Sequence, residues 1–263
     1  MVAVIFLMLP VTTKAAQSNN IVASYFANIA QGYENYGFVY GFSSSVVDRG
    51  MSKPDSYSEE RIAKIGASVP EETTEAAEDT PNIIVVLLES FVDPSDVKFL
   101  QTSEDPVPNF HNLLNNYSSG YLKVPVVGAG TANTEFEVLT GMSMQYFGTG
   151  EYPYKTILKQ TDCESIASDL SKIGYGTHVV HNNTATFYSR NNAFSMMGFD
   201  TFTSKELMNI TQYTPNGNWP TDDILVQETV KALDSTKDQS DFVYTITAVS
   251  YTHLRAHETP EHL

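Results

Sequence analysis

Cysteine and basic residues are scarce in this sequence of 263 residues. Cys163 is the only cysteine, so the chain cannot form an intrachain disulfide or a Cys-x-x-Cys metal knuckle. Lysine and arginine number 15 against 31 aspartates and glutamates, which gives a formal net charge of −16 at pH 7. Binding to nucleic-acid phosphates needs clustered basic residues, so we expect no nucleic-acid partner. Attraction to anionic lipid surfaces is disfavoured as well. An anionic substrate would need a local cation, either a metal ion or a well-placed arginine.

The sequence also lacks a long hydrophobic run. Residues 1–10 (MVAVIFLMLP) are apolar and uncharged, but they make up only about half of the ~20 residues that a membrane-spanning helix needs. No basic segment precedes them, as one would in a signal peptide. A short buried segment is one interpretation. We favour the other, in which these residues are the outer end of a transmembrane helix that begins before Met1.

Residues 11–80 are predicted to be a helical and linker region. Ser58 is typical of the N-cap of a short helix that ends near Ile65, with Glu59 and Glu60 in its first turn. The acidic, threonine-rich stretch 71–80 (EETTEAAEDT) has no apolar periodicity and is typical of a solvated linker. A domain boundary is therefore predicted there, and residues 81–250 form the main domain.

Predicted strands and helices alternate from Pro81 onward. The run 82–88 (NIIVVLL) is continuously apolar, which is typical of a strand buried on both faces of a parallel sheet. Further strands are predicted over residues 121–127, 177–180 and 242–249, and helices over residues 108–117, 131–139, 163–173 and 186–197 and from Thr221. This alternation predicts an α/β fold, with a mainly parallel sheet flanked by helices on both faces.

Glu89 and Thr131 both follow predicted strands, and ligands of open α/β sheets bind at such strand ends. The carboxylate of Glu89 could bind a hard divalent cation, or it could be an acid favoured near the start of a helix. Thr131 follows Gly128-Ala129-Gly130. At a helix start its hydroxyl would lie among unpaired N–H groups that suit a phosphate, and beside a cation it would become a usable nucleophile. Taken alone, an ordinary threonine N-cap is the simpler interpretation.

The string 181–190 (HNNTATFYSR) follows the predicted strand 177–180. It supplies His181, Asn183, Tyr188 and Arg190. One arginine with amide and phenol donors could clamp a phosphate. The alternative is an ordinary polar loop in which Arg190 pairs with a surface acid.

Together these three strings resemble the lipoteichoic acid synthase family, the phosphoglycerol transferase branch of the alkaline phosphatase and sulfatase superfamily. The strings are NIIVVLLESF with Glu89, GAGTANTEF with Thr131, and HNNTATFYSR. Upstream, residues 37–62 resemble the linker that joins membrane helices to the catalytic domain in that family. The resemblance implies that residues 81–250 are an incomplete sulfatase-like catalytic domain. It also implies that this domain lies outside the cytoplasm, on a bacterial cell membrane.

The resemblance further implies a chemistry and a set of site residues. One divalent cation, Mn²⁺ or alternatively Mg²⁺, would be held by Glu89, by Thr131 and by an Asp-His pair much further on. Thr131 would be the nucleophile that takes glycerol phosphate from phosphatidylglycerol and passes it to a glycolipid or polyglycerolphosphate acceptor. The four residues of the HNNTATFYSR string would line the glycerophosphate pocket. Asn183 and Tyr188 stand where the family commonly has Asp and Trp, which affects the head-group side of the pocket more than the chemistry.

Residues 251–263 (YTHLRAHETPEHL) have no counterpart in the family and resemble translated sequencing-adapter sequence, so we expect them to be non-native. A chain without the Asp-His pair is expected to be inactive by itself. Four other functions are alternatives. A sulfatase would need a C/S-x-P-x-R motif, whereas Cys163 stands in TDCESIA. A phosphoethanolamine transferase commonly has disulfides, which a single cysteine cannot form. The other two are a phosphodiesterase of the same superfamily and a non-catalytic envelope-binding domain.

Overall fold

A four-stranded parallel sheet forms the centre of the computed structural model, which describes residues 2–23, 29–48, 50–69, 80–89, 91–126, 130–214 and 219–248. The strand order is β1-β4-β2-β3. The strands are β1 (Ile83–Leu87), β2 (Gly176–His181), β3 (Thr201–Ser204) and β4 (Asp241–Ile246). Leu87 and His181 both pair with Ile246, so the carboxyl ends of three strands meet at one edge of the sheet.

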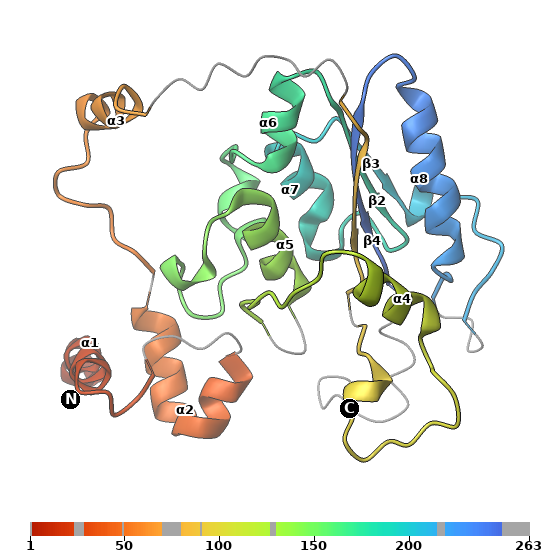
Figure 1. Ribbon diagram of the computed structural model, residues 1–263. Helices are drawn as coiled ribbons and strands as arrows, with labels where there is room; N and C mark the ends of the chain where they lie inside the picture. The colour runs from red at the N-terminus through yellow and green to blue at the C-terminus, as the bar shows by residue number, and fades with distance from the viewer. Residues whose placement is uncertain are drawn as a thin grey trace.

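Helices cover both faces of this sheet, as the sequence predicts. On one face lie α5 (Thr131–Thr140), α6 (Ile166–Lys172) and α7 (Arg190–Met196), and on the other lies α8 (Asp223–Ser235) (Figure 1). The larger core includes Phe136 of α5, Phe194 of α7 and Tyr244 of β4, which are all buried. A smaller core joins Leu225 of α8 to the sheet. Burial on both faces fixes the positions of the strand ends.

The N-terminal helices lie to one side of the sheet (Figure 1). They are α1 (Val2–Ser18), α2 (Ile29–Val47) and α3 (Glu59–Gly66). Met51 N donates to Tyr146 O at 2.8 Å, and Thr149 Oγ1 donates to Asp48 Oδ2 at 2.6 Å, so this region contacts the main domain. Helix α1 continues through Pro10, across the boundary predicted there. Within the described ranges, no helix combines the length and the apolarity that crossing a membrane requires. The predicted linker lies almost wholly outside the described residues.

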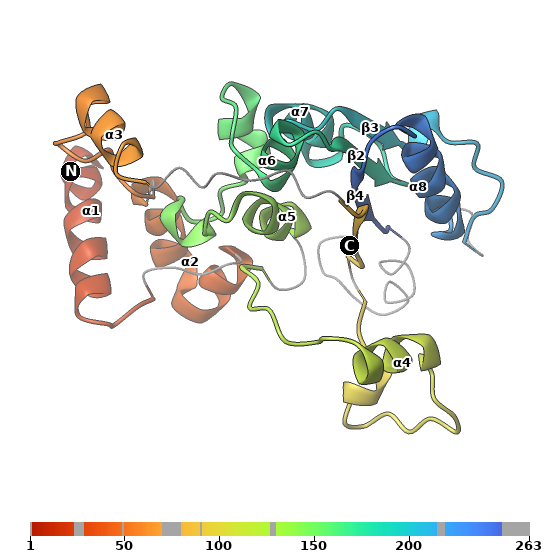
Figure 2. The ribbon, with the colours of Figure 1, turned by 45° about the horizontal axis from the view of Figure 1, so that its top comes forward.

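Helix α4 (Pro108–Asn116) belongs to an excursion between β1 and α5 that projects away from the sheet (Figure 2). Short 3₁₀ turns complete the described structure: η1 (Pro94–Asp96), η2 (Met144–Tyr146), η3 (Pro153–Lys155), η4 (Ile157–Lys159), η5 (Phe187–Ser189) and η6 (Lys205–Leu207). Turns η3 and η4 lie in the loop between α5 and α6.

The predicted helix ends are largely confirmed. Ser58 caps α3, and its side chain accepts a hydrogen bond from Arg61 N at 3.2 Å. Gly174 follows α6 with φ +92°, a left-handed conformation that glycine adopts without a steric penalty. The helix predicted over 186–197 is instead interrupted, because Tyr188 and Ser189, the last two residues of η5, have φ of 57° and 60°, and α7 begins only at Arg190.

Two strand predictions are wrong in part. Residues 121–126 form no strand: Pro125 removes a backbone donor, Tyr121 is fully exposed, and β-branched content alone does not supply a pairing partner. Residue 127 lies outside the described residues. Strand β1 forms as predicted but is not buried on both faces, since Val86 is 52% exposed. It is an edge strand of the described sheet, and an apolar run cannot distinguish an edge from a centre. Strand β3, which is short and polar, was not predicted.

Candidate active site

Thr131 is the first residue of α5, so it lies inside the helix and not at the N-cap position. Gly130 is the N-cap, with φ +100°, and no side chain caps this helix. The interpretation of Thr131 as an N-cap is therefore wrong. Its side chain instead lies beside the carboxylate of Glu89 and acts to lower the pKa of that carboxyl. Asn133 N donates to Gly130 O at 2.9 Å, so an anion at this helix start would be bound by the N–H groups of Thr131 and Ala132.

Glu89 lies just beyond β1, and its position also excludes a capping role. Its N–H donates to Thr247 Oγ1 at 3.2 Å, which ties it to the chain beyond β4. The next helical turn, η1, is capped by Asp93 instead. The Glu89 side chain is only 7% exposed. Burial raises its pKa above the ordinary value, and Arg190 and the Thr131 hydroxyl oppose that rise.

Arg190 is fully buried and connects the site residues. Its Nη2 lies 3.2 Å from Glu89 Oε1, and its Nη1 lies 3.2 Å from His181 Nε2. Its Nε lies 3.1 Å from Glu135 Oε2, and Nη2 also bonds the other oxygen of Glu135. Burial opposes the charge of Arg190, but the two glutamates hold its pKa above the ordinary value. Arg190 thus pairs with buried carboxylates. The alternative interpretation, in which it pairs with a surface acid, is therefore wrong.

Glu135 was not identified from the sequence. It is fully buried and lies four residues after Thr131, one turn further along the same face of α5. That spacing was the available signal. A buried carboxylate on a helix needs a partner, and the one described here is Arg190.

His181 is fully buried at the end of β2, and both of its ring nitrogens are engaged. Nδ1 lies 2.9 Å from Ile246 O, which can only accept, and Nε2 faces Arg190, which can only donate. These partners assign the neutral tautomer with the proton on Nδ1. Burial and then the charge of Arg190 lower the pKa of His181 to about 3. His181 therefore holds Arg190 as a neutral acceptor.

The remaining predicted pocket residues lie on two sides of this network. Tyr188 stacks on Tyr152 with ring centroids 5.5 Å apart, and Arg190 Cζ lies 5.3 Å from the centre of its ring. Burial raises the pKa of Tyr188 to about 12. Asn183 is buried but bonds elsewhere: its Oδ1 accepts from Thr184 N at 2.7 Å, and its backbone oxygen accepts from Lys205 N. The described contacts join Glu89, Thr131, His181, Tyr188 and Arg190, but not Asn183.

A divalent cation at this site would be held by oxygen ligands. The Glu89 carboxylate and the Thr131 hydroxyl are hard donors that lie near each other, so they fit such a cation in kind. In number they are too few, because Mg²⁺ and similar ions take about six ligands. Among the residues that the structure describes, no group of three Asp, Glu, His or Cys side chains is arranged to bind a metal. Glu89 and Thr131 can therefore supply only part of a metal site.

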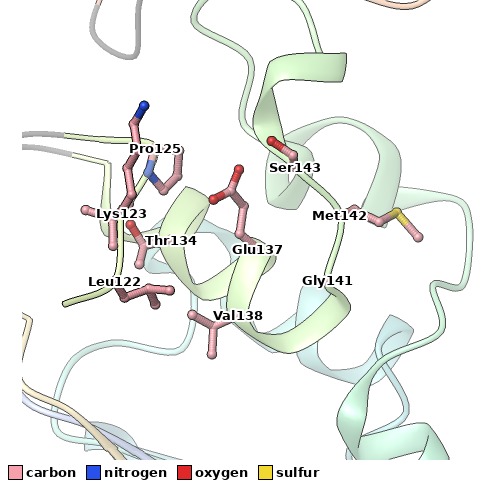
Figure 3. Close-up of a pocket in the computed structure, with 10 residues that line it drawn as sticks. Leu122, Lys123, Pro125, Thr134, Glu137, Val138, Gly141, Met142 and Ser143 are labelled. Carbon is pink, nitrogen blue, oxygen red and sulfur yellow. The ribbon is translucent and has the colours of Figure 1, made fainter. Parts of the chain in front are cut away.

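A cavity of about 180 Å³ lies near α5 but away from these residues (Figure 3). Figure 3 shows Thr134, Glu137 and Val138 of α5 facing the segment 122–125. Glu137 accepts a hydrogen bond from Met144 N at 2.5 Å, so its carboxylate ties the end of α5 to η2. The cavity lining includes neither Glu89 nor Thr131, so we do not place the chemistry there.

The fold and the strand-end site define an α/β domain of the alkaline phosphatase and sulfatase type. The family model described as Sulfatase matches residues 81–258, so the chain belongs to the sulfatase family. A protein of Rhizobium meliloti (strain 1021), provisionally described as a cyclic beta-1,2-glucan modification protein, is 29% identical over 209 residues. That similarity covers 79% of this chain and 31% of the relative.

Two solved structures share the fold. The lipoteichoic acid synthase LtaP from Listeria monocytogenes has a TM-score of 0.55 at 24% identity, over 65% of this chain and 41% of that one. The Streptococcus pyogenes phosphoglycerol transferase GacH, in complex with sn-glycerol-1-phosphate, has a TM-score of 0.57 at 24% identity, over 76% of this chain and 54% of that one. The chain thus spans about a third to a half of the length of these relatives.

Proposed function

We propose that this chain is part of a phosphoglycerol transferase that uses Thr131 as its nucleophile. The single observation that supports it best is the placement of Thr131, at the start of α5, beside the buried carboxylate of Glu89, whose pKa the Thr131 side chain lowers. The sulfatase-family match and the shared fold of LtaP and GacH add support. Sulfatases of the main type need Cys or Ser where Thr131 stands, so phosphate chemistry is favoured over sulfate chemistry.

The proposed reaction has two displacements at phosphorus. Thr131 Oγ attacks the phosphate of phosphatidylglycerol, an Oγ–P bond forms, and the bond from phosphorus to the diacylglycerol oxygen breaks. Diacylglycerol leaves with the proton that Thr131 loses. An acceptor hydroxyl then attacks the glycerophosphothreonine, the P–Oγ bond breaks, and Thr131 regains a proton. The N–H groups at the start of α5 orient the phosphate oxygens and stabilise their charge.

Glu89 and Thr131 would also be two ligands of a divalent cation, with Mn²⁺ or Mg²⁺ as the candidates. Such a cation lowers the pKa of a bound hydroxyl and offsets charge on the phosphate. Its remaining ligands would come from residues outside the described part of the protein. The proposed location is the outer face of a bacterial cell membrane, where the lipid donor is found.

The proposed acceptor is a glycolipid or a polyglycerolphosphate chain. The relative from Rhizobium meliloti favours a second candidate, a glucan hydroxyl, because its description names a cyclic glucan. Product analysis with each acceptor and radiolabelled phosphatidylglycerol distinguishes the two.

The test of the proposed function is release of diacylglycerol from phosphatidylglycerol by the full-length protein of which this chain is a part, with and without added Mn²⁺. Thr131→Ala is expected to abolish turnover and the covalent glycerophosphate adduct detectable by mass spectrometry. Thr131→Ser, which keeps a hydroxyl, is the matched control and should retain both. Full turnover by the alanine variant would exclude the covalent mechanism.

A further inference from the structure

The buried network around Arg190 carries more negative than positive charge. One guanidinium faces the carboxylates of Glu89 and Glu135, and its third neighbour, His181, is neutral. All three guanidinium nitrogens are engaged with these side chains. A phosphate that reaches Thr131 therefore meets no surplus positive charge from this network, and the charge of the phosphate needs a second cation.

Lys155, the last residue of η3, is an exposed cation close to this network. Its Nζ lies 5.0 Å from the ring centre of Tyr188 and 5.3 Å from that of Tyr152. It forms no ion pair with any residue in the described part of the chain. Two aromatic faces thus hold the ammonium group without neutralising its charge.

The same two tyrosines adjoin the residue before the proposed nucleophile. The position that a Cβ atom would take on Gly130 lies 3.2 Å from Tyr152 Oη. The backbone of Gly130 also lies near the Tyr188 hydroxyl and acts to lower the pKa of that hydroxyl. Lys155 therefore lies over a pair of rings whose hydroxyl groups are close to Gly130, the N-cap residue of α5. The long lysine side chain can turn from these rings towards an anion at Thr131.

We propose that Lys155 binds the phosphate of the glycerophosphate-bearing substrate, with the rings of Tyr152 and Tyr188 holding its ammonium group at the edge of the site. The proposal rests on the proposed function. It adds a cation of the protein to the divalent cation already proposed at Glu89 and Thr131, because the paired Arg190 supplies no surplus charge. A lysine ammonium is a usual point-charge partner of phosphate.

The experiment compares Lys155→Met with Lys155→Arg and with Lys159→Met, an exposed lysine in the next turn. KM and kcat for phosphatidylglycerol are measured, together with binding of sn-glycerol-1-phosphate by calorimetry. Lys155→Met is expected to raise KM and weaken binding by about tenfold, the usual size of a hydrogen bond to a charged group. Little change in kcat is expected, because the phosphate charge that Lys155 binds is present in both the bound substrate and the transition state, so the loss is one of uniform binding. Lys155→Arg should restore most of the loss, and Lys159→Met should match the wild type. The dependence of KM on salt should weaken in Lys155→Met.

Equal KM and equal binding in Lys155→Met and the wild type would overturn the assignment of Lys155 and leave the proposed function standing. A full-length wild-type protein without turnover contradicts the proposed function, and the binding data still test Lys155. Loss of binding in Lys159→Met to the same extent would also overturn the proposal, because it would indicate a diffuse effect of charge. Circular dichroism confirms that each variant is folded.

Discussion

Arg190 and Glu135 form a buried ion pair in which the guanidinium binds both carboxylate oxygens, with Nε 3.1 Å from Oε2, and neither side chain is exposed to solvent. This pair joins α5, which begins with Thr131, to α7. The orientation of the proposed nucleophile therefore depends on a charge pair in the protein core.

Removing Glu135 leaves the buried charge of Arg190 with too little compensation. Glu135→Ala is expected to destabilise the fold by about 3–5 kcal/mol, the usual effect of breaking a buried pair from one side. Glu164→Ala is the control, because Glu164 is exposed and pairs with the exposed Lys172, so about 0–1 kcal/mol is expected. Urea denaturation measures both. Equal losses of unfolding free energy in the two variants would show that the buried pair stabilises the fold no more than the exposed pair does.

The sequence predicts the α/β class, most of the helices, the strand-end positions of Glu89 and His181 and the helix start at Thr131, because these follow from local apolar patterns. The strand predicted before Thr131 does not form over its described residues, 121–126. Nor does the sequence predict that Glu135 and Arg190 pair, since they are 55 residues apart and only the packing of α5 against α7 brings them together. The left-handed conformations of Tyr188 and Ser189 were missed for a similar reason: tertiary contacts, such as the stacking on Tyr152, override helix propensity there.

His181 is expected to make the protein less stable in acid. Its folded pKa of about 3 lies below its ordinary value of 6.5, so the folded state binds fewer protons between these values. The stability that neutral His181 contributes to the folded state is therefore present above pH 6.5. It is lost as the pH falls towards 3, by up to about 1.4 kcal/mol per pH unit. His181→Asn keeps a donor for Ile246 O and removes the titration. Its melting temperature should depend less on pH in this window, and an unchanged slope would contradict the assignment.

His111 is expected to have the opposite pH dependence. It lies 2.6 Å from Asp93 and 2.8 Å from Asp105, and hydrogen bonds first to Asp105 and then to Asp93 raise its pKa. The stability that protonated His111 contributes is present below its ordinary pKa of 6.5 and is lost as the pH rises through its raised pKa in the folded state. His111→Gln should therefore reduce the loss of stability above pH 6.5. Hydrogen exchange in α4, which contains His111, measures the effect locally, and Asp55→Asn, a change in an exposed acid, is the control.

Gly130→Ala tests whether the start of α5 tolerates a side chain. Gly130 has φ +100°, and an added Cβ would lie 3.2 Å from Tyr152 Oη and 3.3 Å from Val126 Cγ1. Both the left-handed backbone and the close contacts oppose alanine, so a loss of about 1–2 kcal/mol is expected. Displacement of Tyr152 should also weaken the binding of sn-glycerol-1-phosphate. Gly120→Ala is the matched control, because Gly120 has no positive φ and no atom within 4 Å of its added Cβ. If the two alanine variants unfold at the same urea concentration and bind the probe equally well, the close contact between Gly130 and Tyr152 has no part in shaping the site.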